Sequence, residues 1–257
     1  AALLISKTHD DFSYYHFPYT YYLTQNELFI GIGKFGHGLR TPSSIFYLNS
    51  LFALPFIKYF SFNFGQVFIM GFVNIILVKK IINYLKKNKS NKINIKEIFY
   101  LSLFSLIFIN IFFYRISEHG TDRSAQILIF IFIIELISLF FKLKISKEDL
   151  SHLFLLSVII ISLKAFYLMY FIFIIPLLFI LNLKKQKIIN SLKLLFLSAN
   201  FICFSILFSL VILSYFFNTG CLVYPISITC FENLSWSISS KSVSNMNDWY
   251  ELWSKAG

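Results

Sequence analysis

The sequence predicts an all-α, polytopic transmembrane helical bundle, and its composition and patterning carry that prediction. Hydrophobic residues make up 57% of the 257 residues and charged residues only 14%, whereas a soluble domain has about 25% charged residues. Apolar runs recur along most of the chain, as in polytopic α-helical proteins. The alternating ten-residue pattern of a membrane β-barrel is absent from the sequence. No repeat or second domain is visible, so residues 1–257 are interpreted as one integral-membrane domain.

The first 64 residues are expected to form an external loop with interfacial helices. The chain opens with AALLIS and no initiating Met, so we expect a fragment whose missing first helix ends there. Residues 42–60 are apolar but contain Asn49 and Pro55. This run is short for a span, so we expect an amphipathic helix lying in the interface. If it crossed the membrane instead, the segment before it would lie on the cytoplasmic side.

A glycine-rich stretch, GIGKFGHG at residues 31–38, lies within this first loop. It lacks the strand and the Lys-Ser/Thr pair of a phosphate-binding loop. Four glycines in eight residues instead predict a mobile loop between interfacial helices.

Six membrane segments are predicted between residues 65 and 217. They lie at about 65–81, 98–116, 125–141, 151–164, 165–181 and 194–217. A single helix over 151–181 would put two lysine-rich loops on opposite faces, so we expect the chain to turn near Lys164. Each half of that hairpin would be about 22 Å long. That is shorter than a ~30 Å hydrocarbon core, so neighbouring helices must shield it or the bilayer must thin.

Lysines in three short loops set the predicted orientation. These loops follow the first, third and fifth segments and hold Lys79, Lys80, Lys86, Lys87, Lys89, Lys92, Lys96, Lys142, Lys144, Lys147, Lys184, Lys185, Lys187 and Lys193. The positive-inside rule makes these loops cytoplasmic, and it accounts for the net charge of +11 without a nucleic-acid partner. Residues 1–64, 117–124 and the tail 218–257 are then external. We expect a multi-pass protein of the bacterial cytoplasmic (inner) membrane with both ends of this chain outside.

The expected external segments hold most of the polar residues other than lysine. Asp10 and Asp11 are adjacent, and adjacent residues point in different directions in regular structure. One of them can therefore bind or activate a substrate while the other caps the following helix, and Asp11 is the candidate for the cap. Asp122 and Arg123 begin the third segment. They are either an N-cap with a snorkelling cation or part of a phosphate site. His119 with Asp122 supplies only two metal-ligand types, which is a weak metal pattern.

Polar residues inside the apolar runs have open interpretations as well. Lys164 is expected to be paired or functional, or simply to reach the outer surface at the turn. Glu135 should meet a polar partner or be protonated. Cys221 and Cys230 can form a disulfide in an oxidising compartment.

The motif HDDFSYYHFPY at residues 9–19 resembles the first external loop of the GT-C superfamily of membrane glycosyltransferases. The nearest members are bacterial relatives of protein mannosyltransferases and aminoarabinose transferases, which carry an acidic pair after their first helix. Many have a Tyr-His-x-Pro element, matched by Tyr15, His16 and Pro18. A Pro-led interfacial helix and an Asp before a later helix match Pro42 and Asp122. The tail GCLVYPISITCF resembles a bacterial family of polytopic membrane proteins with no assigned function.

The resemblance implies an inverting transfer of a sugar from a polyprenyl-phosphate carrier to a glycan or lipid acceptor at the outer face. It implies Asp11 as general base, with Asp10 as its partner or as a ligand of a divalent cation, Mg or Mn. The donor phosphate would be bound by residues from the set Arg123, His119, His16, Arg40 and Lys164, supported by Tyr15 and Asp122. Two alternatives are a transporter or flippase, which would have charged or broken helices near the midplane, and a non-catalytic assembly protein for lipid-linked glycans.

Overall fold

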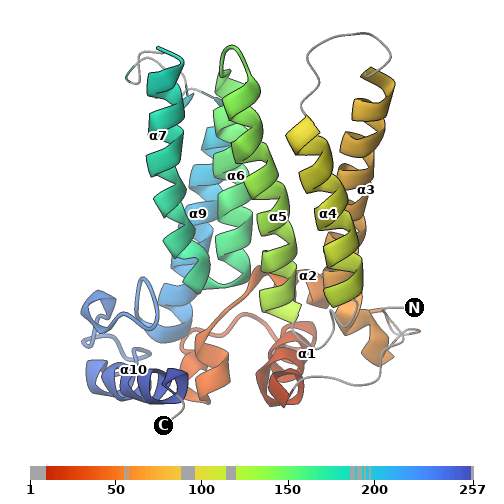
Figure 1. Cartoon of the computed structure of the whole chain (residues 1–257). Coiled ribbons are helices and arrows are strands. Elements are labelled where there is room, and N and C mark those ends of the chain that lie inside the picture. The colour runs from red at the N-terminus through yellow and green to blue at the C-terminus, as the bar shows by residue number, and fades with distance from the viewer. Residues whose placement is uncertain are drawn as a thin grey trace.

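The structure is a computed structural model that is helical throughout its regular parts. It describes residues 10–54, 56, 58–87, 96–113, 120–185, 189, 193, 195–196 and 198–255, without the side chains of 58–60 and 253. The opening stub AALLIS and loop residues Lys89, Lys92 and Lys187 lie outside that set. Within it there is no β-strand, and long helices run side by side as a bundle (Figure 1). The prediction of an all-α helical bundle is confirmed.

Each of the six predicted membrane segments corresponds to a helix. They are α3 (Phe64–Lys87), α4 (Lys96–Phe112), α5 (Gly120–Phe141), α6 (Lys147–Leu163), the 3₁₀ helix η8 (Ala165–Phe173) continuing into α7 (Ile174–Leu183), and α9 (Ala199–Thr219). Four stretches are long and apolar enough to cross a membrane: Ser61–Lys86, Gly120–Phe141, Ala165–Leu183 and Ala199–Thr219. The chain is therefore a multi-pass membrane protein.

The predicted turn of the 151–181 run occurs at Lys164. Helix α6 ends at Leu163, and Lys164 adopts an extended conformation with φ −158° and ψ 128° before η8 begins. The 3₁₀ geometry of η8 rises about 2.0 Å per residue, so η8 and α7 together span about 33 Å. The second half of the hairpin is thus long enough to cross, and the expectation that it is too short is wrong for that half.

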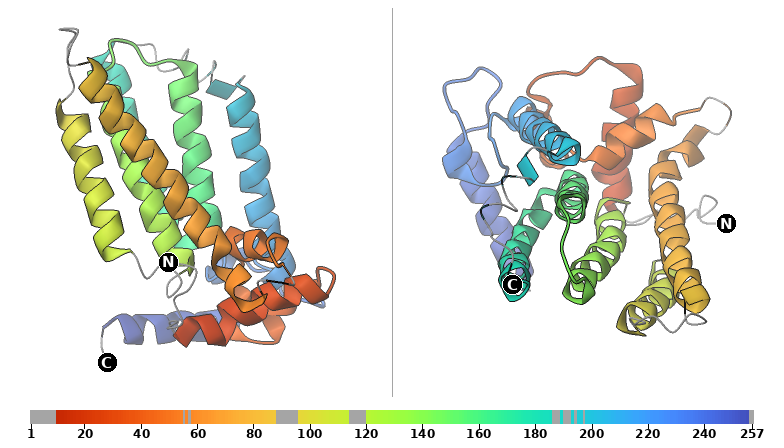
Figure 2. Two further views of the ribbon diagram at one scale, coloured as in Figure 1. Left: turned by 90° about the vertical axis from the view of Figure 1, so that its right-hand side faces the viewer. Right: turned by 90° about the horizontal axis from the view of Figure 1, so that it is seen from above.

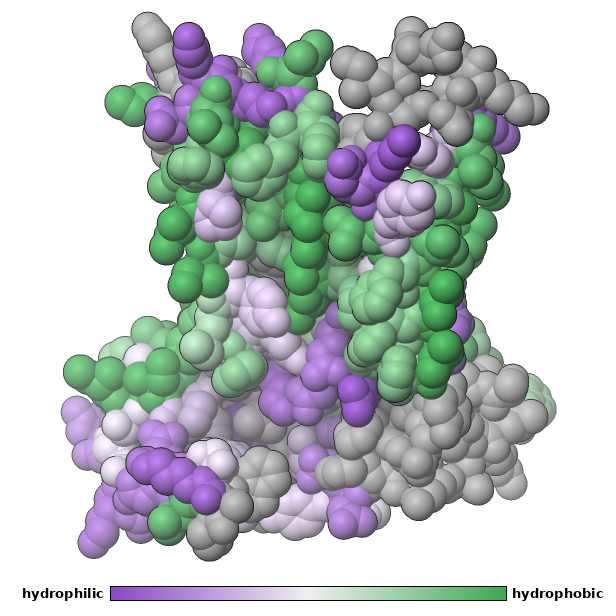
Figure 3. All heavy atoms as spheres, viewed as in Figure 1, coloured by the Kyte–Doolittle hydropathy of each residue, from purple (hydrophilic) through white to green (hydrophobic). Residues whose placement is uncertain are grey.

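The core of the bundle lies around α5, which packs against α3, α4 and α6, while α9 packs on α6. Ile127, Ile131 and Ile134 of α5 are buried. Asn74 of α3 and Asn110 of α4 exchange two side-chain hydrogen bonds of 3.2 and 3.0 Å, the kind of polar contact that joins helices in lipid. On the face shown in Figure 3, apolar side chains form a belt across the middle of the molecule, between its two more polar ends.

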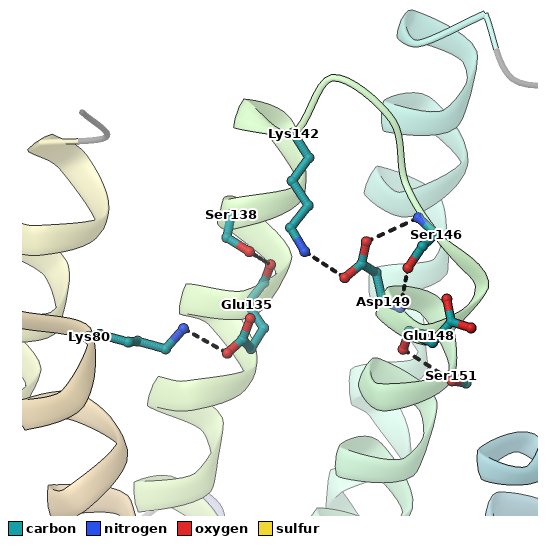
Figure 4. A network of polar contacts seen from close by, with 8 residues as sticks. All are labelled: Lys80, Glu135, Ser138, Lys142, Ser146, Glu148, Asp149 and Ser151. Atoms are coloured by element: carbon teal, nitrogen blue, oxygen red, sulfur yellow. Dashed lines mark hydrogen bonds and ion pairs between the residues drawn. The ribbon is translucent and has the colours of Figure 1, made fainter. Parts of the chain in front are cut away.

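One end of the bundle carries the lysine-rich loops. Glu135 of α5 pairs with Lys80 of α3 at 2.7 Å, which supplies the polar partner expected for it. At the start of α6, Ser146 Oγ accepts a hydrogen bond from Asp149 N while the Asp149 carboxylate accepts one from Ser146 N. Lys142 pairs with the same Asp149 carboxylate (Figure 4).

The opposite end is covered by short helices that we call the cap, made of residues 10–63 and 220–255. Its α-helices are α1 (Phe17–Gln25), α2 (Ser44–Leu51) and α10 (Ser240–Ser254), lying across the end of the bundle (Figures 1 and 2). Helix α2 has eight residues, about 12 Å of helix, so it is too short to span the membrane. Asn49 of α2 is buried, and its Oδ1 accepts a 2.8 Å hydrogen bond from the Gly65 N–H of α3.

Candidate functional site

An ion pair joins two membrane helices at the cap end. The Nζ of Lys164, at the α6–η8 turn, lies 2.7 Å from Oδ1 and 2.8 Å from Oδ2 of Asp122 in the first turn of α5. The two side chains are 42% and 38% exposed. Lys164 is therefore both at the outside of the turn and paired, two alternatives that the sequence left separate. The pair keeps the Lys164 ammonium at the level where the apolar belt meets the cap.

A second cation lies directly beside this pair. The guanidinium of Arg123 sits over the Phe113 ring, 4.9 Å from its centroid, and Nη1 donates a 3.1 Å hydrogen bond to Gln126 Oε1. Tyr167 of η8 directs its hydroxyl at the Asp122 carbonyl, 3.5 Å away. The positive charge of Arg123 in the first turn of α5, with the helix N-terminus behind it and the Lys164 ammonium on the neighbouring Asp122, favours an anionic ligand.

The acidic pair lies in the cap at the start of the first described helical segment. Asp10 is exposed and Asp11 half-buried. Asp11 precedes a π-helix, Phe12–His16, and its side chain makes no capping bond to that helix, so the capping alternative is not realised. π-Helical geometry is rare and recurs at functional sites. In this chain the π-helix includes Tyr15 and His16.

The Tyr15 phenol is affected by acidic groups from both segments. Burial raises its pKa well above the usual tyrosine range, and the negative charges of Asp11 and Asp122 raise it further. The Tyr15 phenol therefore stays protonated and able to donate a hydrogen bond throughout the physiological pH range. Tyr250 of α10 belongs to the same neighbourhood, because its pKa is raised by burial, by Tyr224 and by Asp11.

Two expected phosphate ligands lie beneath the surface of the cap. His16 is 5% exposed and packs against the rings of Tyr15 and Phe46, with centroids 4.4 and 5.3 Å away. Arg40 is 8% exposed, and its Nε donates to the Gly33 carbonyl at 3.1 Å while Nη1 donates to Ser242 Oγ at 3.4 Å. These contacts give Arg40 a structural role in joining the glycine-rich loop to α10. The third, His119, lies outside the described residues.

The glycine-rich loop is packed, contrary to the expected mobile loop. Gly31 has φ 83°, and a Cβ there would lie 2.7 Å from the Trp236 Cβ; a Cβ on Gly33 would lie 2.7 Å from the Asn218 carbonyl oxygen. A Cβ on Gly38 would lie 2.2 Å from the Tyr15 Cβ, whereas Gly36 has open space. Three of the four glycines thus permit close contacts, and one of those contacts positions Tyr15.

The described residues do not by themselves build a divalent-cation site. Within the described ranges there is no cluster of three or more His, Cys, Asp or Glu side chains placed to hold a metal ion. Mg²⁺ prefers six oxygen ligands, and Asp122 already faces the Lys164 ammonium. Asp10 as a cation ligand stays a prediction.

Sequence reasoning placed the tail on the same face as the acidic segment but did not identify α10 within it. Helix α10 brings Tyr250 and Ser242 next to the acidic segment and Arg40, and the tail's disulfide joins Cys221 to Cys230. The only sequence signal for α10 is the amphipathic spacing of Val243, Met246 and Tyr250, which indicates a helix lying on a surface.

A family model described as a domain of unknown function, DUF8201, matches residues 4–256. The chain belongs to the DUF8201 family. No curated protein and no solved structure matches this DUF8201 chain. The family description names no activity.

Proposed function

We propose that this DUF8201 protein is a membrane glycosyltransferase that moves a sugar from a polyprenyl-phosphate-type lipid donor to an acceptor hydroxyl at the outer face of the cytoplasmic membrane. One observation carries the proposal. The negative charges of Asp11 and Asp122 both act on the buried Tyr15 phenol, and Asp122 pairs with Lys164 at the cap end of the bundle. A lipid phosphate and a water-soluble or lipid-borne acceptor can both reach that level of the membrane.

The proposed chemistry needs a base on the acceptor side. The acceptor oxygen attacks the anomeric carbon and inverts it, the bond from that carbon to the phosphate oxygen breaks, and polyprenyl phosphate leaves with the bonding electrons. The Asp11 carboxylate takes the proton of the acceptor hydroxyl, as a general base does. Tyr15, held protonated beside it, donates a hydrogen bond to the acceptor or to the sugar. Asp10 supports Asp11 from the exposed side.

The leaving phosphate needs positive charge near the bilayer boundary. Lys164 and Arg123 provide it from the start of η8 and of α5. Arg can hold phosphate through two parallel hydrogen bonds, and Lys acts as a point charge. Asp122 keeps the Lys164 ammonium at the mouth of the site while the donor is absent, so its role is positioning.

The distribution of charge and cysteine supports an outward-facing cap. The described loop lysines gather at the end opposite the cap, as the positive-inside rule expects for cytoplasmic loops. The cap carries the Cys221–Cys230 disulfide, and disulfides persist in oxidising compartments.

The transporter alternative has less support from the described helices. Transport sites sit near the midplane on broken or charged helices. The Lys80–Glu135 pair lies toward the lysine-rich end, near Lys142 and Asp149 (Figure 4), and Lys164 lies at the opposite end, at the α6–η8 turn.

Donor consumption by the purified protein tests the proposal. The chain is placed in lipid nanodiscs with a panel of radiolabelled polyprenyl-phosphate sugars and a membrane extract as the source of acceptor. We expect at least one donor to lose its sugar, with polyprenyl phosphate appearing in equal amount by mass spectrometry. In proteoliposomes, donor that changes leaflet without losing its sugar would instead establish a flippase. If no donor in the panel is cleaved and none changes leaflet, the transferase proposal is wrong and the assembly-protein alternative remains.

A further inference from the structure

The segment that follows α9 presents an apolar surface outside the helical bundle. We call residues 221–231 the apolar loop. The Cys221–Cys230 disulfide closes it, and it contains no charged residue. Its outward side chains are hydrophobic, with Ile228 91% exposed. The other exposed hydrophobic members are Leu222, Ile226 and Phe231.

The backbone of the apolar loop is unusually self-sufficient. At least seven of its ten backbone N–H groups donate to acceptors within residues 219–231, because Leu222 N bonds Thr229 O at 3.0 Å and Phe231 N bonds Gly220 O at 2.9 Å, with five more of the same kind. Thr229 Oγ1 also donates to the Val223 carbonyl at 3.0 Å. Lipid offers no hydrogen bonds, so a backbone that enters it must be satisfied internally. A loop surrounded by water needs no such arrangement.

The apolar loop is continuous with the lipid-facing side of α9. Helix α9 exposes Ile206, Leu210 and Leu213 toward the outside of the bundle. The rings of Phe216 near the end of α9 and Phe231 in the loop lie edge to face, with centroids 5.8 Å apart. Figure 3 shows apolar side chains extending outward just below the belt, at the edge where Figure 1 places the segment after α9.

We propose that the apolar loop dips into the bilayer at the boundary between headgroups and acyl chains, and so fastens the cap to the membrane beside α9. The occupant of its surface is lipid. The exposed hydrophobic side chains, the absence of charge and the satisfied backbone all fit a hydrocarbon boundary, where burying apolar surface is favourable. The Cys221–Cys230 disulfide keeps the exposed hydrophobic residues together in one compact loop.

Site-directed photo-crosslinking tests this placement. p-Benzoyl-phenylalanine is introduced singly at Ile228, at Leu210 on the outward face of α9, and at Asp248 on the exposed surface of α10. The full chain is reconstituted in nanodiscs of phosphatidylethanolamine and phosphatidylglycerol and irradiated. We expect lipid adducts at Ile228 at a yield close to that of Leu210 and severalfold above that of Asp248, detected by mass spectrometry of the intact protein.

Other adducts would overturn the proposal. Crosslinks from Ile228 to a second copy of the chain, seen at twice the mass, would make the apolar loop a self-association surface. An adduct yield at Ile228 no higher than at Asp248 would place the loop in water. The proposal does not depend on the transferase activity, because the readout is lipid contact alone.

Discussion

Lys164 Nζ contacts both carboxylate oxygens of Asp122, at 2.7 and 2.8 Å, although 42 residues separate the two in sequence. The contact ties the turn between α6 and η8 to the first turn of α5. It also fixes a positive charge at the level where the apolar belt ends. The site at the cap end depends on this arrangement, because Asp122 and the acidic segment act together on Tyr15.

Breaking this pair should separate a small structural effect from a large functional one. Both side chains are partly exposed, so we expect a coupling of about 0.5–1 kcal/mol in a double-mutant cycle of Lys164→Gln and Asp122→Asn, measured by thermal unfolding in detergent. Donor consumption by Lys164→Gln should fall about tenfold or more, the cost of losing one charge-assisted hydrogen bond to phosphate.

The Lys142–Asp149 pair at the lysine-rich end provides the matched control. Lys142→Gln removes an ion pair that also joins the end of α5 to α6 (Figure 4), at the end of the bundle opposite the cap (Figure 1). We expect a similar change in unfolding and no change in donor consumption. Equal loss of activity in Lys142→Gln and Lys164→Gln would show that the effect is general destabilisation.

The close packing of Tyr15 should require a glycine at position 38. A Cβ there would lie 2.2 Å from the Tyr15 Cβ, an atom that cannot move without its backbone. Gly38→Ala should therefore destabilise the protein by about 1–3 kcal/mol, the usual cost of overpacking, and lower donor consumption by displacing Tyr15. Gly36→Ala is the control, because nothing lies within 4 Å of its added Cβ. Identical behaviour of the two variants in unfolding and in turnover would contradict the packed arrangement of this loop.

The tail disulfide should contribute measurably to the stability of the cap. Cys221 and Cys230 are nine residues apart, and closing a loop of that size stabilises by about 2–3 kcal/mol in the chain-entropy model. The double variant Cys221→Ser, Cys230→Ser should lose about that much. In the unchanged protein, alkylation before and after reduction should differ by two labels in intact mass. Alkylation of all three cysteines without reduction would contradict the pairing.

The two ends of the bundle should label from opposite sides of the membrane. In a Cys203→Ser background, Ser13→Cys in the cap should react with a membrane-impermeant maleimide in intact cells. Lys144→Cys, in the loop between α5 and α6, should react only after permeabilisation. Both positions are exposed, so the difference reports sidedness and not burial. Labelling of Lys144→Cys alone in intact cells would reverse the proposed orientation.

Local sequence features were enough to predict the positions of the long helices and the turn between two of them. Apolar length identifies helices because the bilayer sets that length, and four of the six predicted segments meet it in the structure. The lysine-rich loops on both sides of 151–181 required a turn, and it occurs at Lys164. The 3₁₀ geometry of η8 was not predictable, because its apolar composition fits an α-helix equally well, and it lengthens the second half of the hairpin.

The partners of the polar residues could not be predicted from local sequence. Asp122 was a candidate N-cap and Lys164 a candidate surface residue, and only the packing of α5 against α6 pairs them. The partner of Glu135 in α5 is Lys80, which comes from α3, two helices earlier in the chain. The glycine-rich loop has a mobile composition, yet it is packed because Tyr15 and Trp236 come from distant segments to contact it.

The most direct test of the proposed transferase compares Asp11→Asn with Asp10→Asn. Both changes keep the side-chain shape and remove the charge. Only the residue that acts as general base has to accept the proton of the acceptor hydroxyl, so only its replacement should block the reaction. We predict that Asp11→Asn consumes the lipid-linked donor at least about 100-fold more slowly than the unchanged protein with an unaltered unfolding temperature, and that Asp10→Asn loses less. A folded Asp11→Asn protein that transfers sugar at the unchanged rate would contradict the account.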